Sequence, residues 1–289
     1  MIVDKQTPND LDMKLNVYTR YAIALTLVMT LYACGDDDKA PALKPQLPAQ
    51  TPADAVKQIQ HFGNVRTSYD WTFTYSEDRL TVAAGQLNDG TNNSGTNYSY
   101  TAWLNYWPGG MGMTHSNGDK LSLSLNSDEK IAQMNVNNSA YRFNYTDGRL
   151  TAWDKTVTEN AFGQAQTYHS QAAITYSGGD ITEIVYRAAG GAVTTVTLTP
   201  SLIINRSGLL PETVAEELGL LGLEHLYYAG LMGKASLHLP ASLTRTITSG
   251  NSTTSETISF DYGTDNEGRV VVCNYTTPEG GVASVSYKY

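Results

Sequence analysis

The chain has 289 residues, 41% of them hydrophobic, which suffices for one large core or two small ones. Its 28 acidic residues outnumber its 19 basic ones and give a formal net charge of −9, so nucleic acid is excluded as a partner because its phosphates would be repelled. Two cysteines, Cys34 and Cys273, are too few for a fold held together by disulfides, so the fold must depend on its core.

Residues 1–33 contain the features of a secretory signal peptide. Lys14 and Arg20 precede an apolar run over residues 21–32, which is too short for the roughly 20 residues that span a bilayer. The polar stretch before Met13 suits no signal peptide, so we place the start of translation at Met13. A membrane anchor helix with an incidental cysteine is the disfavoured alternative.

The signal ends in Leu-Tyr-Ala-Cys at residues 31–34, which resembles the bacterial lipobox. This resemblance implies cleavage after Ala33 and acylation of Cys34, whose acyl chains would hold the protein on a membrane. Residues 34–52 would then form a lipid anchor and a tether. Residues 35–52 contain four prolines and no aromatic residue, and when extended they reach on the order of 55 Å at about 3.1 Å per residue.

The acidic run Gly-Asp-Asp-Asp-Lys at residues 35–39 follows the lipobox cysteine directly. It resembles the export tract of Bacteroidota surface lipoproteins, and the resemblance implies an outer-membrane location with the protein facing outward. The alternative is a solvated charge run of the kind common in linkers.

Residues 53–289 predict a single β-rich domain, because hydrophobic side chains alternate with polar ones. Leu121, Leu123 and Leu125 share one face of a strand, and Ser122 and Ser124 share the other. Short turn signals containing Gly and Asn separate the strands. We expect a mostly β fold: a curved antiparallel meander or barrel-like sheet of about fourteen strands.

A degenerate repeat runs through these strands. It reads FTYSEDRLT at 73–81, FNYTDGRLT at 143–151 and ITYSGGDIT at 174–182, with a longer copy, FDYGTDNEGRVV, at 260–271. Each copy predicts a hairpin with an inward aromatic pair before the turn and an inward aliphatic residue after it. The copies resemble tyrosine-aspartate repeats, but their irregular spacing argues against a solenoid or a propeller.

The most suggestive candidate site is NYSYTAWLNYWPGG, residues 97–110. Tyr98, Tyr100 and Tyr106 would share one face of a strand, and Trp103 and Trp107 the other. If the tyrosine face packs in the core, both tryptophans are exposed, as in binding sites for sugar rings or proteins. The alternative is that another strand or the chain termini cover them.

One segment interrupts the strand pattern. Pro211 and Gly219 bracket a predicted helix, and the sequence that follows to Pro240 is apolar on nearly all sides. We expect this segment to pack on the concave face of the sheet and to fill it.

The helix, the following GLMGKASLHLPASLT at 230–244, the hairpins and the lipobox together resemble a Bacteroidota lipoprotein domain of unknown function with a porin-like fold. The resemblance covers about residues 65–289, implies a barrel-like sheet and gives no activity. Alternation alone does not distinguish a membrane barrel from one surrounded by water. The anchor and the apolar segment 218–232 favour a water-surrounded barrel with a plugged interior.

No catalytic residue, metal site or cofactor is predicted. The histidines lack zinc-ligand spacing. Adjacent Glu224 and His225 are interpreted as a solvated or partly buried pair rather than an acid/base pair. The carboxylates of Asp261, Asp265 and Glu267 lack the spacing of a calcium loop or a glycosidase pair. Cys273 reads as a small buried hydrophobic residue.

Three functions remain open. The first is a non-enzymatic, outer-membrane, surface-exposed lipoprotein that acts as a binding or structural module, with a glycan or a surface protein as the candidate partner at Trp103 and Trp107. The second is a carrier or sensor of an apolar ligand in the barrel interior, which requires a pocket of about 300 Å³ or more. The third is a glycan-degrading enzyme, which requires two carboxyl groups roughly 5 to 10 Å apart in a cleft.

Overall fold

The computed structural model describes residues 54–63, 68–77, 79–88, 99–107, 110–116, 120–161, 164–219, 222–277 and 280–289. The predicted signal region, Cys34, the tether and Tyr98 lie outside the described residues. In the described part of the chain, no helix has both the length and the apolar character that a membrane crossing requires.

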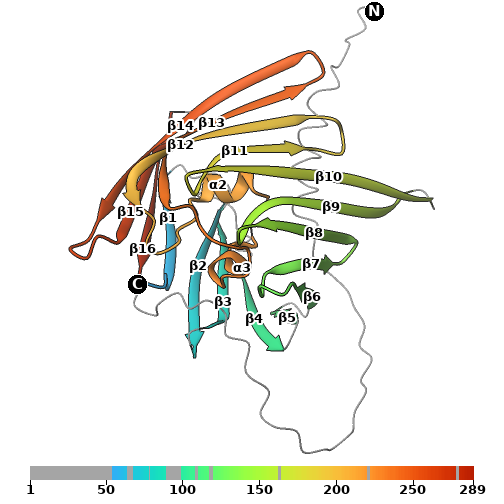
Figure 1. The fold of residues 1–289 in the computed structure, drawn as a ribbon, viewed down its shortest axis with the longest axis horizontal. Helices are drawn as coiled ribbons and strands as arrows, with labels where there is room; N and C mark the ends of the chain where they lie inside the picture. The colour runs from blue at the N-terminus through green and yellow to red at the C-terminus, as the bar shows by residue number, and fades with distance from the viewer. Residues whose placement is uncertain are drawn as a thin grey trace, which may run out of the picture.

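The described residues form a closed barrel of sixteen strands in which each strand pairs with its neighbours in the sequence, and β1 pairs with β16 to complete the ring (Figure 1). The pairing is antiparallel throughout. The strands are β1 (Gln58–Gly63), β2 (Ser68–Ser76), β3 (Arg79–Asn88), β4 (Ser99–Trp107), β5 (Gly110–His115), β6 (Lys120–Leu125), β7 (Ile131–Val136), β8 (Ser139–Thr146), β9 (Arg149–Ala161), β10 (Gln164–Ser177), β11 (Asp180–Arg187), β12 (Val193–Ile204), β13 (His238–Ser249), β14 (Ser252–Thr264), β15 (Val270–Thr276) and β16 (Val282–Lys288).

The predicted number of about fourteen strands was therefore too low, and of the two expected arrangements, a curved meander or a barrel-like sheet, the chain forms the barrel. β5 contains two glycines, which are depleted in strands, so composition indicates such an element poorly. Closure depends on pairs such as Gln58 with Lys288 and Gly63 with Ala283, which join the two ends of the domain. Local sequence carries no signal for such a pairing.

Between β12 and β13, the described residues 209–219 and 222–232 lie largely inside the barrel (Figure 1). They form two short helices, α2 (Glu212–Glu217) and α3 (Glu224–Tyr228), rather than one. Gly219 follows α2 with a φ of +70°, a conformation that glycine adopts readily, and it ends the helix where predicted. We call residues 209–232 the plug.

The plug and the inward side chains of the wall form one hydrophobic core. On the wall, Trp71, Phe73 and Trp153 are buried, and the plug contributes a set of apolar side chains to the same cluster: Leu209, Leu210, Val214, Ala215, Leu218, Leu226, Tyr228, Leu231 and Met232. These plug residues are enclosed by a closed wall, so the expected packing of one helical segment on a concave face described the arrangement only roughly.

The outward face of the wall is polar. In β6, Leu121 and Leu123 are buried while Ser122 and Ser124 are exposed. Polar residues are exposed at many outward positions of other strands as well: Arg142, Asn144, Gln171, Thr175, Glu183, Thr197, Thr257, Ser259 and Asp261. A membrane-spanning barrel has an apolar outer band and a polar interior. This wall has the reverse polarity, which suits a barrel surrounded by water.

The sequence repeat corresponds to one recurring hairpin geometry. The register of the β-ladder shifts immediately before Tyr75, Tyr145 and Tyr176. In each of the three hairpins the threonine that ends the repeat donates its hydroxyl to the carbonyl seven residues earlier, at distances of 3.2, 3.3 and 3.3 Å. The ladder skips this threonine in each hairpin, so the threonine is the extra residue of a β-bulge.

The repeat hairpins all turn at the same end of the barrel, which we call the plug end because the plug enters there; the opposite end is the far end. At the plug end, tyrosine hydroxyls of several strands donate to main-chain carbonyls of the neighbouring strand or segment: Tyr75 to Val56, Tyr106 to Leu80, Tyr145 to Ile131, Tyr262 to Pro240 and Tyr289 to Val270. The arginine of a turn also lies over a tyrosine ring, as Arg149 does over Tyr176 at 5.4 Å.

Candidate functional site

Trp103 and Trp107 lie on the outward face of β4. Their side chains are 42% and 49% exposed, whereas the alternate residues Ala102 and Leu104 are buried. Tyr106 is half-buried on the inner side and donates a 2.8 Å hydrogen bond to the carbonyl of Leu80. The strand therefore divides as its alternation indicates, and within the described residues the two tryptophans stay uncovered.

The ring of Trp107 rests against a glycine of the next strand. Gly112 of β5 pairs with Asn105 of β4, and a Cβ atom built at Gly112 would lie 3.0 Å from Cη2 and 3.1 Å from Cζ3 of Trp107. The missing side chain is what lets the indole pack onto the backbone of β5. Trp107 is thus held beside the wall rather than projecting freely from it.

The neighbours of the tryptophans are small and uncharged. Trp103 lies between Val82 of β3 and Thr114 of β5, and Gly112 pairs with Ser122 of β6. We call Val82, Trp103, Asn105, Trp107, Gly112, Thr114 and Ser122 the aromatic surface. It combines two apolar rings with hydroxyl and amide groups that donate and accept hydrogen bonds. Such a surface suits a neutral ligand that has both apolar faces and hydroxyl groups.

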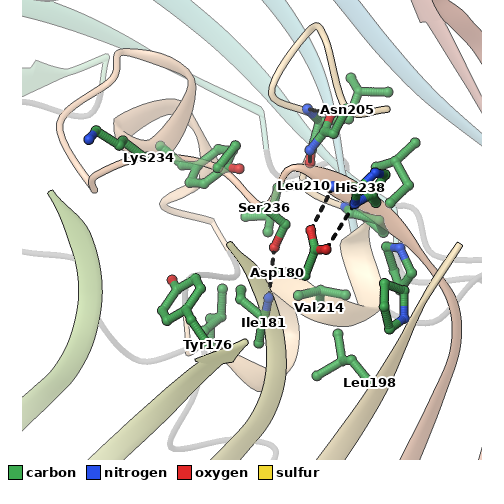
Figure 2. A pocket seen from close by; sticks show the side chains of 18 of the residues that line it. Tyr176, Asp180, Ile181, Leu198, Asn205, Leu210, Val214, Lys234, Ser236 and His238 are labelled. Carbon is green, nitrogen blue, oxygen red and sulfur yellow. Dashed lines mark hydrogen bonds and ion pairs between the residues drawn. The ribbon is translucent and has the colours of Figure 1, made fainter. Parts of the chain in front are cut away.

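A small pocket lies at the plug end, between the plug and the wall strands β10 to β13. Its free volume is about 30 Å³, room for one or two water molecules. Leu198, Leu210 and Val214 are among its apolar lining, while Asp180 and His238 bring polar groups to it (Figure 2).

The polar groups of this pocket hold the chain in place. Asp180 accepts a 2.6 Å bond from the His238 backbone N–H through Oδ1, and its Oδ2 lies 2.9 Å from Nδ1 of the His238 ring. Figure 2 shows the Ser236 hydroxyl directed at the Ile181 N–H, from which it accepts a 3.1 Å bond. These bonds fasten the segment before β13 to the start of β11, which is a structural task.

Glu224 and His225 are buried rather than solvated or partly buried, so that expectation was wrong. Their exposures are 5% and 0%. Nε2 of His225 lies 2.9 Å from the sulfur of Met113, and its ring centroid is 5.1 Å from that of Trp71. The burial of these two residues was not predictable from the sequence, because a helix on a protein surface has a solvent-facing side, whereas a helix enclosed by a barrel has none.

Burial keeps both groups uncharged at neutral pH. Loss of hydration raises the pKa of Glu224 to about 8, although backbone and Trp71 hydrogen bonds act in the opposite direction. Burial, assisted by the charge of His115, lowers the pKa of His225 to about 3. Each group therefore stays in its neutral form, which has the lower desolvation free energy in an apolar interior.

The fold is similar to that of solved proteins from Bacteroides. A porin-like protein from Bacteroides uniformis superimposes with a TM-score of 0.60 at 18% identity, over 81% of this chain and 97% of that one. The barrel has a porin-like fold. A porin-like protein from Bacteroides vulgatus matches with a TM-score of 0.45 at 11% identity, over 81% and 98%. No protein-family model and no curated protein sequence matches this chain.

The remaining acidic and thiol candidates have structural surroundings in this porin-like fold. Asp265 accepts backbone bonds from Glu267 and Arg269 and pairs with the Arg269 guanidinium, so it shapes the β14–β15 turn. Asp261 is exposed on β14. Cys273 is 1% exposed in the core, as predicted. Among the described residues, no group of three or more His, Cys, Asp or Glu side chains is arranged to hold a metal ion.

Proposed function

We propose that this chain is a lipid-anchored outer-membrane protein, facing outward, whose barrel is a non-enzymatic module that binds carbohydrate on its outer wall. The observation that carries the proposal is the exposure of Trp103 and Trp107 together on a wall whose other outward positions are mostly polar. Exposed aromatic side chains rimmed by polar groups are typical of binding sites.

The spacing of the two rings favours an extended glycan over a single sugar. Trp103 and Trp107 are four positions apart on one strand, which corresponds to about 13 Å at roughly 3.3 Å per residue. A chain of several sugars could stack on both, with its hydroxyl groups bonding to Asn105, Thr114 or Ser122. None of the seven residues that define this surface is charged, although Lys120 pairs with Thr114 at its edge, and this composition favours a neutral glycan.

The anchor part of the proposal depends on the sequence. The lipobox around Cys34 and the acidic run after it support acylation and export to the cell surface. The polar outer wall and the apolar, filled interior support a barrel that is held at the membrane by acyl chains rather than by its strands.

A carrier of apolar ligands is the weaker candidate. Such a function requires about 300 Å³ or more of apolar space, and the pocket beside the plug has about 30 Å³. The plug side chains occupy the space that a ligand would need.

The binding proposal is tested with the Trp103→Ala/Trp107→Ala double variant on immobilised neutral glycans. We expect retention to fall at least tenfold with an unchanged melting temperature, since each stacked ring contributes about 1 kcal/mol. Phe62→Ala and Tyr168→Ala are matched controls, because these aromatic residues are also exposed, at 52% and 40%. Equal loss in the controls, or binding of a surface protein but of no glycan, would contradict the carbohydrate proposal.

The anchor is tested separately by replacing Cys34 with Ala. We expect the variant to leave the membrane fraction and the wild type to incorporate labelled fatty acid. Retention of the variant in the membrane fraction would refute acylation at Cys34 without affecting the glycan result.

A further inference from the structure

Three aliphatic side chains are strongly exposed at the plug end. Leu202 is 97% exposed, Ile204 57% and Leu237 50%. Ile204 pairs with His238, and the backbone N–H of Asn205 donates a 2.8 Å bond to the carbonyl of Leu237. The three residues therefore belong to one sector of the barrel rim, at the end of β12 and the start of β13. We call them the apolar rim.

The exposure of Leu202 is built into the path of β12. The register between β12 and β13 shifts between Thr199 and Pro200 and again between Pro200 and Ile204. The additional residues of β12 bulge out of the ladder, and Leu202 lies within this bulge. Its neighbour Ile203 packs against the core, which leaves Leu202 directed away from it.

The predicted tether joins the barrel at the same end. Asp54 is the first described residue, and Lys57 nearby donates a 2.7 Å backbone bond to Lys288 at the end of β16. The β14–β15 turn lies between this point and the apolar rim, since Arg206 donates to the carbonyl of Glu267 at 3.4 Å. Arg269 of the same turn interacts electrostatically with Asp54. One hairpin thus separates the tether from the apolar rim.

We propose that the apolar rim is a membrane-contact surface, so that the barrel stands on the lipid bilayer with its plug end down. This inference depends on the lipid anchor of the proposed function. A bilayer holding Cys34 would face the end from which the tether leaves. The opposite orientation would require the tether to run beside a strand such as β14, whose 13 residues span about 43 Å at roughly 3.3 Å per residue. That path would use most of the predicted reach of the tether.

Contact with the bilayer depends on apolar insertion rather than on charge. Arg206 and Lys234 are exposed at this rim, exposed Glu267 lies beside Arg206, and the Asp265–Arg269 ion pair is neutral, so these five groups together carry a net charge of only +1. Association should therefore persist at high salt, unlike the attraction of a basic patch to anionic lipids.

The orientation also leaves the middle of β4 open. β4 and β12 are eight strands apart in the ring of sixteen, so they lie on opposite sides of the barrel wall. A bilayer under the apolar rim would leave Trp103, in the middle of β4, accessible to glycans from the side.

The test uses the acylated protein in phosphatidylcholine vesicles that contain bromine-labelled lipid. Leu202→Cys carries an environment-sensitive fluorophore, and Val282→Cys, 65% exposed at the far end, is the matched control. Cys273 is buried, which directs labelling to the introduced cysteine. We expect a blue shift and lipid quenching at position 202 and neither at 282, with no change between about 0.05 and about 0.5 M salt.

Two further variants extend the test. In a chain labelled at Leu237→Cys, the added substitutions Leu202→Ser/Ile204→Ser should reduce the lipid quenching by at least half. Phe62→Ser at the far end, added to the same labelled chain, should leave the quenching unchanged. Equal quenching at positions 202 and 282, or none at either, would overturn the proposal. A blue shift at 202 that depends on protein concentration and occurs without vesicles would also overturn it, in favour of contact between two copies of the chain.

The result of the membrane-contact test can be separated from the result of the Cys34 acylation test. If Cys34 proves not to be acylated, the same comparison of positions 202 and 282 is made with Cys34→Ala added, which keeps the label on the introduced cysteine, and with the chain held on vesicles through an N-terminal histidine tag and a nickel-chelating lipid. Failure of the glycan test leaves this comparison unaffected.

Discussion

The indole of Trp153 on the barrel wall donates a 2.7 Å hydrogen bond from Nε1 to the carbonyl of Leu218 at the end of α2. The two residues are 65 positions apart, and both are buried. The carbonyls at a helix C-terminus have no partner within the helix, and here the wall supplies one. The same indole packs against Gly219, whose Cβ, if present, would lie 2.8 Å from Cζ2 of the ring.

Replacing Trp153 with Phe should loosen the plug. The variant keeps most of the apolar contact but leaves the Leu218 carbonyl buried without this donor, which costs about 1–3 kcal/mol. We expect the urea midpoint of unfolding to fall accordingly. Trp103→Phe, at an exposed position, should leave the midpoint within error of the wild type; an equal loss in both variants would mean that the plug bond is unimportant.

A buried ion pair makes a second connection between wall and plug. Arg245 of β13 lies 3.1 Å from the Glu217 carboxylate of α2 and 2.6 Å from that of Glu256 on β14. Arg245→Met would remove the cation and leave the buried Glu217 carboxylate without its ion-pair partner. The loss of one partner of a buried pair typically costs about 3–5 kcal/mol of stability. We expect Arg245→Met/Glu217→Gln to recover much of that loss in a denaturant titration. Failure of the second substitution to recover stability would contradict the role assigned to the pair.

Glu224 should make the protein less stable as the pH rises. Its folded pKa of about 8 lies above the ordinary value of 4.5, so between these values the folded state keeps a proton that the unfolded state has released. Stability is then lost at up to about 1.4 kcal/mol per pH unit until the folded group ionises. We expect urea titrations to show a smaller decrease between about pH 5 and about pH 8 for Glu224→Gln than for the wild type. Parallel decreases would contradict the neutral, buried carboxyl.

His225 should act on the acidic side. Its folded pKa of about 3 lies below the ordinary value of 6.5, so the unfolded chain binds a proton first and stability falls as the pH drops below about 6.5. His225→Gln should reduce this acid sensitivity in thermal melts at pH values between about 4 and about 6. His169→Gln, an exposed position on β10, is the control and should leave the pH profile unchanged.

Gly112 should control the aromatic surface without supporting the fold. A side chain at this position would displace the Trp107 ring, because the Cβ alone reaches within 3.0 Å of it. We expect Gly112→Val to reduce glycan retention several-fold while the melting temperature is unchanged or higher, since valine favours strands. Ala84→Val, an exposed outward position on β3, is the matched control. Full retention by Gly112→Val would separate the orientation of Trp107 from binding.

The candidate site was predictable in part. Alternation along β4 correctly indicated that Trp103 and Trp107 face away from Tyr106 and the core. The glycine under Trp107 was not predictable, because Gly112 meets that ring only through the register of β4 and β5. The apolar rim was not predictable either, because the bulge that exposes Leu202 depends on how β12 pairs with β13.

By itself the sequence determined the class of structure: hydrophobic residues that alternate along the chain can be buried only on one face of a strand, and each repeated Tyr–turn–Thr segment is long enough to close its own hairpin. These are local consequences of side-chain spacing. The tertiary structure decided what lies around those strands. Closure by β1 and β16 turned one face of every strand inward, and the enclosed plug then left Glu224 and His225 without water on any side. Burial of that kind is a property of contacts between segments far apart in the chain, which local spacing does not encode.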